Sequence, residues 1–175
     1  MFDEILHKLK EYFVTNFQAT NLVKLVKIMS NYEVQTSLQI SQIPCIIISP
    51  NGERYIRSQV GNLYDQYFNI IVRIIARSTD MNKYRDPSYE KNIYKLSEKI
   101  RDKLVQNKTL DGLVTGIGEE YAIKDIDVLY NNTNGLFNCR EISLSYYRFS
   151  TFVGNRNDQK NTQVPSGINP PVPEI

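Results

Sequence analysis

The sequence predicts an α+β fold with a mostly antiparallel sheet of about four strands, flanking helices and an extended C-terminal tail. Three observations support this class. Two segments repeat apolar residues at helical spacing, several others are rich in Ile and Val or alternate as strands do, and four of the chain's seven prolines follow residue 154. With 175 residues, the chain is expected to form a single α+β domain over residues 1–153 and a Pro-rich, extended or disordered tail over residues 154–175.

The composition excludes several classes of function. Hydrophobic residues make up 41%, charged residues 23% and the net charge is +2, which is typical of a soluble domain and not of a protein that coats nucleic acid or a membrane surface. No segment approaches the roughly 18 consecutive apolar residues of a membrane-spanning helix. Two cysteines and one histidine exclude a disulfide scaffold and a multi-histidine metal site. We therefore expect a protein that is not an enzyme and that uses no cofactor and no metal.

The first helix is expected at the N-terminus. Its apolar residues recur at spacings of three and four, as a buried helical stripe requires, and they are Phe2, Ile5, Leu6, Leu9, Tyr12 and Phe13. His7 lies on this helix among apolar neighbours, a position typical of a surface or packing residue and not of a ligand. From residue 15 to 43 the pattern is ambiguous, and we expect a helix to about Met29 followed by a strand over 32–40.

Two strands are expected next. Residues 44–50 form a short β-branched run that ends at the turn signal Pro50-Asn51-Gly52. Because both faces of this run are apolar, it should be covered on both sides. Residues 53–62 are expected to leave the sheet as an excursion. Residues 64–77 form the longest strand candidate, which we place at the centre of the sheet.

The clearest helix signal follows. Asp86 is placed at the N-cap and Pro87 at the first helical position, where its missing N–H costs nothing. The helix is expected to end at Asn107 and Lys108, before a turn over 109–112. Its buried stripe should consist of Ile93, Leu96, Ile100 and Leu104.

The rest of the domain is predicted to be a β-meander. We expect a short strand over 113–118, a strand over 122–130, a hairpin tip over 131–135 and a returning strand over 136–152. The buried face of the returning strand should consist of Ile142, Leu144 and Tyr146.

Motifs for nucleophilic, phosphate-binding or zinc chemistry are absent from the sequence. Asp125 and Asp127 would share one face of a strand and, with Lys124, have the composition of the Mg²⁺ sites of some nucleases. The nearby acids Asp111, Glu119 and Glu120 add to this set. Paired carboxylates on a solvent-facing strand are common, however, and no supporting motif accompanies them. A metal-dependent nuclease is therefore kept as the alternative from a different class.

Nucleic-acid binding was considered for the aromatic residues near the end of the domain. Tyr146, Tyr147, Arg148 and Phe149 could form a strand on which bases stack. The segment lacks the glycine–aromatic spacing of an RNA-recognition strand, and the net charge is low. We expect these side chains to pack in the core or at an interface, and we expect no sequence-specific binding of nucleic acid.

The order of these elements resembles that of the tail terminator proteins of tailed bacteriophages, also called tail completion or head–tail joining proteins. Residues 44–50 resemble the family's P-x-I-x-I-x-P strand, and residues 67–74 resemble its long central strand. Residues 93–114 resemble its helix followed by an L-x-x-x-x-T-L-x-G-x-V turn, and residues 140–146 resemble its closing R-x-I-x-L-x-Y strand. The resemblance spans roughly residues 1–150.

The resemblance implies a sheet flanked by helices and a sixfold ring of identical subunits. Such a ring caps the tail tube, stops its polymerisation and presents a surface to the head connector, with DNA passing through its lumen. The implied partners are further copies of the chain, the tail tube protein and the neck proteins, with no membrane. The implied location is the virion, after assembly in the host cytoplasm. A head-completion or neck protein of the same virion is the alternative within this class.

Projecting segments are the expected contact regions of such a ring. We expect Arg101 and Lys103 to pair with acids of a neighbouring subunit, and we expect the hairpin tip and the excursion after Pro50 to project from the sheet. The tail from Gly154 could reach an adjacent subunit. The candidate interface residues are Arg101, Lys103, Glu119, Glu120, Asn131, Asn134, Asn51 and Arg54.

Overall fold

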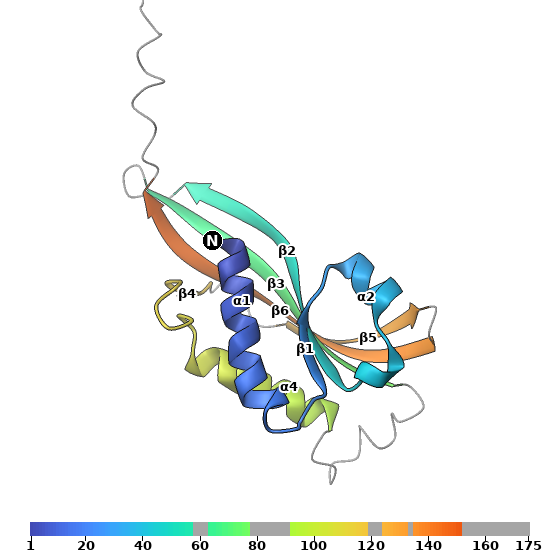
Figure 1. Ribbon diagram of the computed structural model, residues 1–175. Helices are drawn as coiled ribbons and strands as arrows, with labels where there is room; N and C mark the ends of the chain where they lie inside the picture. The colour runs from blue at the N-terminus through green and yellow to red at the C-terminus, as the bar shows by residue number, and fades with distance from the viewer. Residues whose placement is uncertain (58–62, 78–91, 119–123, 133–134, 152–175) are drawn as a thin grey trace, which may run out of the picture.

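The computed structural model describes residues 1–57, 63–77, 92–118, 124–132 and 135–151 of the chain (Figure 1). The elements are α1 (Phe2–Phe13), the π-helical turn η1 (Val14–Gln18), β1 (Leu25–Ile28), α2 (Asn31–Ser37), the 3-10 turn η2 (Ile40–Gln42), β2 (Cys45–Arg57), β3 (Leu63–Arg77), α4 (Ile93–Gln106), β4 (Gly116–Ile117), β5 (Lys124–Asn132) and β6 (Gly135–Thr151). The predicted α+β class is confirmed.

One sheet of six strands connects the described parts of the chain. Its order is β1-β2-β3-β6, and both β4 and β5 pair with β6. β1 is parallel to β2, whereas the other pairs are antiparallel. β3 lies between β2 and β6, so the predicted central strand is confirmed. The sequence predicted about four strands. β1, with 4 residues, lies in a segment predicted to be helical, whereas β4, with 2 residues, lies within the short strand expected over 113–118.

The larger core lies between one face of the sheet and the two helices α1 and α4. Ile46, Ile48, Ile70 and Val72 of the sheet pack in one cluster with the buried residues of both helices. Both predicted stripes are confirmed, because the following residues are all no more than 2% exposed: Ile93, Leu96, Ile100, Leu104, Ile142, Leu144 and Tyr146. We call this side of the sheet the helix face.

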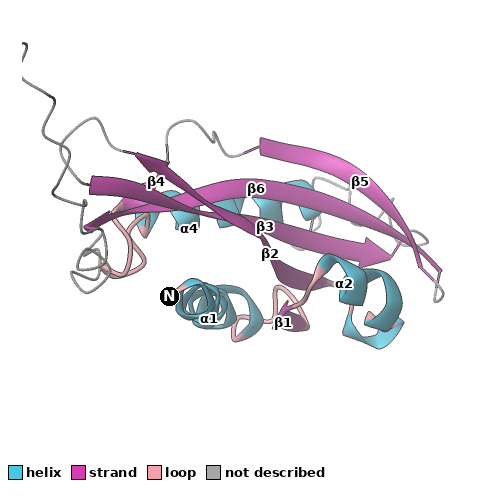
Figure 2. Ribbon diagram, turned by 90° about the horizontal axis from the view of Figure 1, so that it is seen from above, coloured by secondary structure: helices cyan, strands magenta, loops and turns pink. Residues whose placement is uncertain are grey.

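A smaller core covers part of the opposite face, below α2. It contains Met29, Val34, Leu38, Ile43, Cys45, Ile47, Ile75 and Cys139. Ile46, Ile47 and Ile48 are all 0% exposed and divide between the two cores, so the prediction that this strand is covered on both sides is confirmed. Figure 2 shows α2 near the end of the sheet where β5 and β6 turn, while the long strands continue past it in the other direction.

The prediction for residues 15–43 was wrong in two places. The helix does not extend to Met29, since η1 ends at Gln18 and β1 follows. The predicted strand over 32–40 is instead the helix α2 and part of η2. The reason is a capping box: the Glu33 N–H donates to Ser30 Oγ at 3.2 Å, and the Ser30 N–H donates to Glu33 Oε2 at 2.7 Å. This start signal outweighs the alternating apolar residues that follow it.

The predicted end of the strand at Pro50 was also wrong. β2 continues to Arg57, with a register shift between Pro50 and Glu53. Gly52 has φ +96°, which lets the Pro50-Asn51-Gly52 segment form a bulge within the strand instead of a turn. The predicted excursion is therefore paired with β3 as far as Arg57, and the remainder, 58–62, lies outside the described residues.

The predicted start of the second long helix was wrong. α4 begins at Ile93 and not at Pro87, because Asn92 is its N-cap: Asn92 Oδ1 accepts the N–H groups of Tyr94 and Lys95. Asp86, the predicted N-cap, lies outside the described residues. The predicted turn after α4 contains positive φ angles at Leu110, Asp111 and Gly112.

The hairpin of β5 and β6 is present, with Asn132 paired to Gly135. The predicted tail over 154–175 lies outside the described residues. Among the helices that the structure describes, none is both long enough and apolar enough to span a bilayer.

Candidate interaction surface

β2, β3 and β6 continue beyond the helices as a three-stranded extension (Figure 1), which we call the ribbon and define as residues 53–57, 63–67 and 147–151. Backbone pairing holds it together, with Tyr55 opposite Gln66 and Gln66 opposite Arg148. Tyr55 is 57% exposed and Phe149 is 55% exposed. Aromatic side chains are enriched at protein interfaces, so each of these two exposed residues is a candidate contact residue.

Aromatic rings line the ribbon face opposite the helix face. Tyr67 and Tyr147 are directly paired, and their ring centroids are 6.1 Å apart. The ring of Phe149 lies edge-on to Tyr147 at 5.7 Å, and the guanidinium of Arg54 lies 5.0 Å from the centroid of Tyr67. We call these four residues the aromatic face. They combine apolar area with one cation, a composition common at protein interfaces.

The glycines of the β4 segment make room for these rings. A Cβ atom on Gly118 would lie 3.0 Å from Cε1 of Tyr67, and one on Gly116 would lie 3.3 Å from Cε1 of Tyr147. A hollow of about 410 Å³ is open beside the two rings, lined by Tyr67, Lys108, Thr115, Gly116, Ile117, Gly118 and Tyr147. We call it the aromatic groove. Two glycines, two tyrosine rings and one lysine are among the residues that line it.

The other face of the ribbon carries a small polar cluster. The Gln66 Nε2 amide donates to Glu53 Oε2 at 3.0 Å and to the Tyr55 hydroxyl at 2.7 Å. The Tyr55 hydroxyl donates to Glu53 Oε2 at 3.3 Å. Partial desolvation, followed by the charge of Glu53, raises the pKa of Tyr55 above its usual value. The two faces of the ribbon therefore differ in chemistry, one polar and one aromatic.

A buried ion pair lies between the ribbon and the smaller core. Arg73 Nε is 2.6 Å from Glu141 Oε1, and Arg73 Nη1 donates to Ser49 Oγ at 2.6 Å. The side chains of Arg73 and Glu141 are only 4% and 12% exposed. Each of the three residues comes from a different long strand, so the pair joins β2, β3 and β6. Its position within the sheet favours a structural role.

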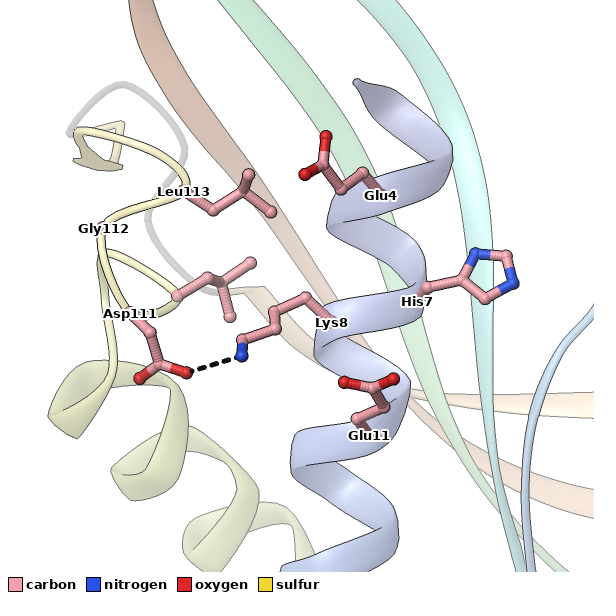
Figure 3. A pocket seen from close by; sticks show the side chains of 8 residues that line it. Glu4, His7, Lys8, Glu11, Asp111, Gly112 and Leu113 are labelled. Atoms are coloured by element: carbon pink, nitrogen blue, oxygen red, sulfur yellow. Dashed lines mark ion pairs between the residues drawn. The ribbon is translucent and has the colours of Figure 1, made fainter.

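A second hollow, of about 430 Å³, lies between α1 and the loop after α4 (Figure 3). Lys8 extends across it, and its Nζ is 3.1 Å from Asp111 Oδ2. His7 Nδ1 lies 2.8 Å from the carbonyl oxygen of Asp3 in its own helix. The charged side chains around this hollow are Glu4, Lys8, Glu11 and Asp111, an arrangement that links two elements but places no nucleophile beside a base.

Neither cysteine is placed for chemistry. Cys45 and Cys139 are both buried, and each pairs with Ile75 from opposite sides. Two strand spacings separate them, roughly 10 Å, which exceeds the Cα separation of about 7 Å that a disulfide allows. Burial raises the pKa of the Cys45 thiol to about 12, so its reactive thiolate is scarce at neutral pH.

The structure does not bring the predicted interface residues together. Arg101 and Lys103 are half-buried on α4, and the Lys103 carbonyl accepts the Tyr12 hydroxyl at 3.1 Å. Their predicted partners, Glu119 and Glu120, lie outside the described residues.

The remaining predicted residues divide between the two ends of the sheet. Asn131 pairs with Leu136 in the β5–β6 hairpin, and Asn134 lies outside the described residues. Asn51 is exposed at the bulge of β2, and Arg54 belongs to the aromatic face. Of the predicted interface residues that the structure describes, these last two lie in or beside the ribbon.

The carboxylates of the nuclease alternative lie in β5. Asp125 pairs with Ile142 and Asp127 pairs with Arg140, two residues apart as predicted. Among the residues that the structure describes, there is no group of three or more His, Cys, Asp or Glu side chains that could hold a metal.

Sequence reasoning missed the aromatic face as a unit. Tyr147 and Phe149 were noted on the last strand, but Tyr67 was counted only as part of the long central strand. The sequence signal for this face was the alternation of polar and aromatic residues with core residues along β3 and β6. The pairing of Tyr67 with Tyr147 depends on strand register, which the sequence does not state.

The comparisons with known proteins add no assignment. No protein-family model matches the chain, and a search of the curated proteins found no significant match.

Proposed function

We propose that the chain is a non-enzymatic tail terminator of a tailed bacteriophage. In this proposal it forms a ring, of six copies by resemblance, on the end of the tail tube, stops polymerisation of the tube and provides the surface that joins the tail to the head connector. The order of the elements supports the proposal. A helix, a buried strand, a long central strand, a second helix, a turn and a closing strand form one α+β unit, as the resemblance requires.

The observation that carries the proposal is the ribbon with its two unlike faces. A ring of identical subunits is built from heterologous contacts, in which each copy uses one surface toward the preceding neighbour and a different surface toward the next. Tyr55 lies on the polar face and Phe149 on the aromatic face, and both are more than half exposed. A projecting ribbon of this kind can insert between two neighbours and contact each with a different chemistry.

The remaining predicted contacts belong to the same proposal. Arg101 and Lys103 pair with Glu119 and Glu120 across the ring interface, while the Asn131 end of the β5–β6 hairpin contacts the tube or the connector. The assembled protein resides in the virion, the ring forms in the host cytoplasm, and DNA passes through its lumen without sequence-specific contacts. A charge reversal at Arg101 tests the pairing of Arg101 and Lys103 with Glu119 and Glu120. If the variant keeps its fold but no longer binds isolated tail tubes, the result would support this pairing.

The test is electron microscopy of lysates from the virus whose genome encodes the chain, with a stop codon placed in this gene. We expect overlong tail tubes beside filled, tailless heads. Tails of normal length beside heads that have lost their DNA would instead indicate a head-completion or neck protein. Infectious particles of normal appearance would contradict a structural role altogether, and DNA degradation by the purified protein, lost in Asp125→Asn, would then support the nuclease alternative.

A further inference from the structure

We infer that the aromatic groove is the docking site for the proline-rich segment 163–173 of the same chain. This segment contains Pro165 and the run Pro170-Pro171-Val172-Pro173, in which the first and last prolines have P-x-x-P spacing. The inference does not rest on the proposed function, since it concerns how a single chain, before any assembly, covers its own surface.

The shape of the groove suits an extended proline-rich segment. Such segments favour the polyproline II conformation, with three residues per turn and about 3.1 Å per residue, so Pro170 and Pro173 would lie on one side, roughly 9 Å apart. The rings of Tyr67 and Tyr147 line the groove at a centroid spacing of 6.1 Å, and the ring of Phe149 packs edge-on against Tyr147 at 5.7 Å. Grooves that bind such ligands are lined by aromatic rings against which the prolines dock.

The polar groups around the groove also match the segment. A polyproline II backbone makes no internal hydrogen bonds, and prolines have no N–H, so such a segment presents carbonyl acceptors and few donors. Among the lining residues, Lys108 has an ammonium group that can only donate, and Thr115 and Tyr147 carry hydroxyl groups. The glycines of the lining leave room for the rings of Tyr67 and Tyr147, which a Cβ atom would crowd.

The position at which β6 ends makes the chain's own tail the favoured occupant. β6 ends at Thr151, only four residues after Tyr147, which is about 13 Å along a strand. The connecting residues 152–162 can span roughly 36 Å when extended. The segment can therefore fold back onto the groove without strain, and the short tether gives it a local concentration in the millimolar range, well above that of a tail from another molecule in dilute solution.

Photo-crosslinking of the full chain tests this inference. The photoreactive residue p-benzoyl-phenylalanine replaces Val172, the protein is irradiated at micromolar concentration, and mass spectrometry identifies the joined peptides. We expect cross-links from residue 172 to peptides that contain Tyr147, Tyr67 or residues 115–118, in a product with the mass of a single chain.

Two variants test whether the cross-link depends on the prolines of the segment and on the aromatic rings at the groove. Replacing the prolines of the segment with Ser should lower the cross-link yield about tenfold, because the preformed extended conformation is lost. Phe149→Ser should also lower the yield, because the Phe149 ring packs edge-on against Tyr147, which lines the groove. Phe149 is 55% exposed, so this change should leave the fold intact, which circular dichroism checks. The matched control is Tyr32→Ser, at a tyrosine that is 74% exposed on α2 and far from the groove in sequence, and its yield should not change.

Other outcomes overturn the inference. Cross-links to peptides outside the groove would mean that another surface binds the segment. Products with the mass of two chains would place a neighbour's tail in the groove. A yield that stays the same after the proline substitutions or Phe149→Ser would show that the contact does not depend on the chemistry proposed.

Discussion

The three long strands behave differently at their two ends, although they are continuous. In the covered half, where helices pack on both faces of the sheet, Ile47, Ile75 and Cys139 lie in one core while Ile46 and Ile48 lie in the other. In the ribbon, the same strands carry half-buried and exposed side chains on both faces. The contrast indicates that one set of strands supplies stability at one end and, in the proposed function, a contact surface at the other.

The energetic difference follows from burial. A fully buried Ile contributes roughly 1.5–3 kcal/mol to the free energy of unfolding relative to an exposed one. The exposed side chains of the ribbon contribute little to it. Substitutions in the covered half should therefore lower the free energy of unfolding, and those in the ribbon should change assembly instead. The predictions below test this division, from the largest expected effect on stability to the smallest.

Removing one partner of the buried ion pair should have the largest effect. Arg73→Met leaves the carboxylate of Glu141, which is 12% exposed, without its cation. We expect a loss of about 3–5 kcal/mol in the free energy of unfolding, measured by urea titration. The double variant Arg73→Met/Glu141→Leu should recover much of this loss. A single variant as stable as the natural protein would show that the pair does not join the strands as described.

Two isoleucines of β2 allow a direct comparison of the two ends. Ile48 is 0% exposed in the larger core, whereas Ile56 is half-buried in the ribbon. We expect Ile48→Ala to cost about 2–5 kcal/mol and Ile56→Ala to cost about 1 kcal/mol or less. Equal costs, determined by the same urea titration, would contradict the distinction between the covered half and the ribbon.

A buried hydroxyl at the junction of the two regions should be dispensable. Tyr146 is 0% exposed, and its hydroxyl has no hydrogen-bond partner among the described residues. Burial, followed by the charge of Tyr12, raises the pKa of Tyr146 far above its usual value. Tyr146→Phe should leave the protein equally stable or about 1 kcal/mol more stable, by thermal unfolding. A marked destabilisation would mean that the hydroxyl has an essential partner.

The cap of α2 should make the stability of the covered half depend on pH. Hydrogen bonds with the backbone and side chain of Ser30 lower the pKa of Glu33 below its usual value of 4.5. The stabilisation by this carboxylate is therefore complete above pH 4.5 and is lost as the pH falls through the lowered pKa. The difference in Tm between the natural protein and Glu33→Ala should shrink from pH 7 to pH 3. A difference that does not change with pH would contradict the capping role.

Much of the covered half could be predicted from the sequence, because strong local signals agree with the burial there. The stripe of α4 and the run from Ile46 to Ile48 were both identified correctly. α2 was misassigned because alternating apolar residues suggested a strand, while the Ser30–Glu33 cap decides for a helix. The bulge at Gly52 was taken for a turn, since the two have the same residue signature.

The ribbon could not be predicted to the same extent. Its aromatic face depends on which residues pair across β3 and β6, and Arg54 reaches Tyr67 only because β2 resumes pairing after the bulge. Register and bulges are set by the whole sheet and not by a local sequence pattern. Asn51 and Arg54, which were predicted in a projecting excursion, lie instead within the strand β2, in or beside the ribbon.

The ribbon variant Tyr55→Ser/Phe149→Ser should have the smallest effect on stability and the largest on function. It removes the two exposed aromatic rings and should change the free energy of unfolding by only about 0.5 kcal/mol. The decisive measurement is tail length by electron microscopy, in a virus that lacks this gene and is supplied with the natural protein, the ribbon variant or the control Tyr32→Ser. The account predicts normal tails with the natural protein and the control, and overlong tubes with the ribbon variant. Normal tails with the folded ribbon variant would contradict it.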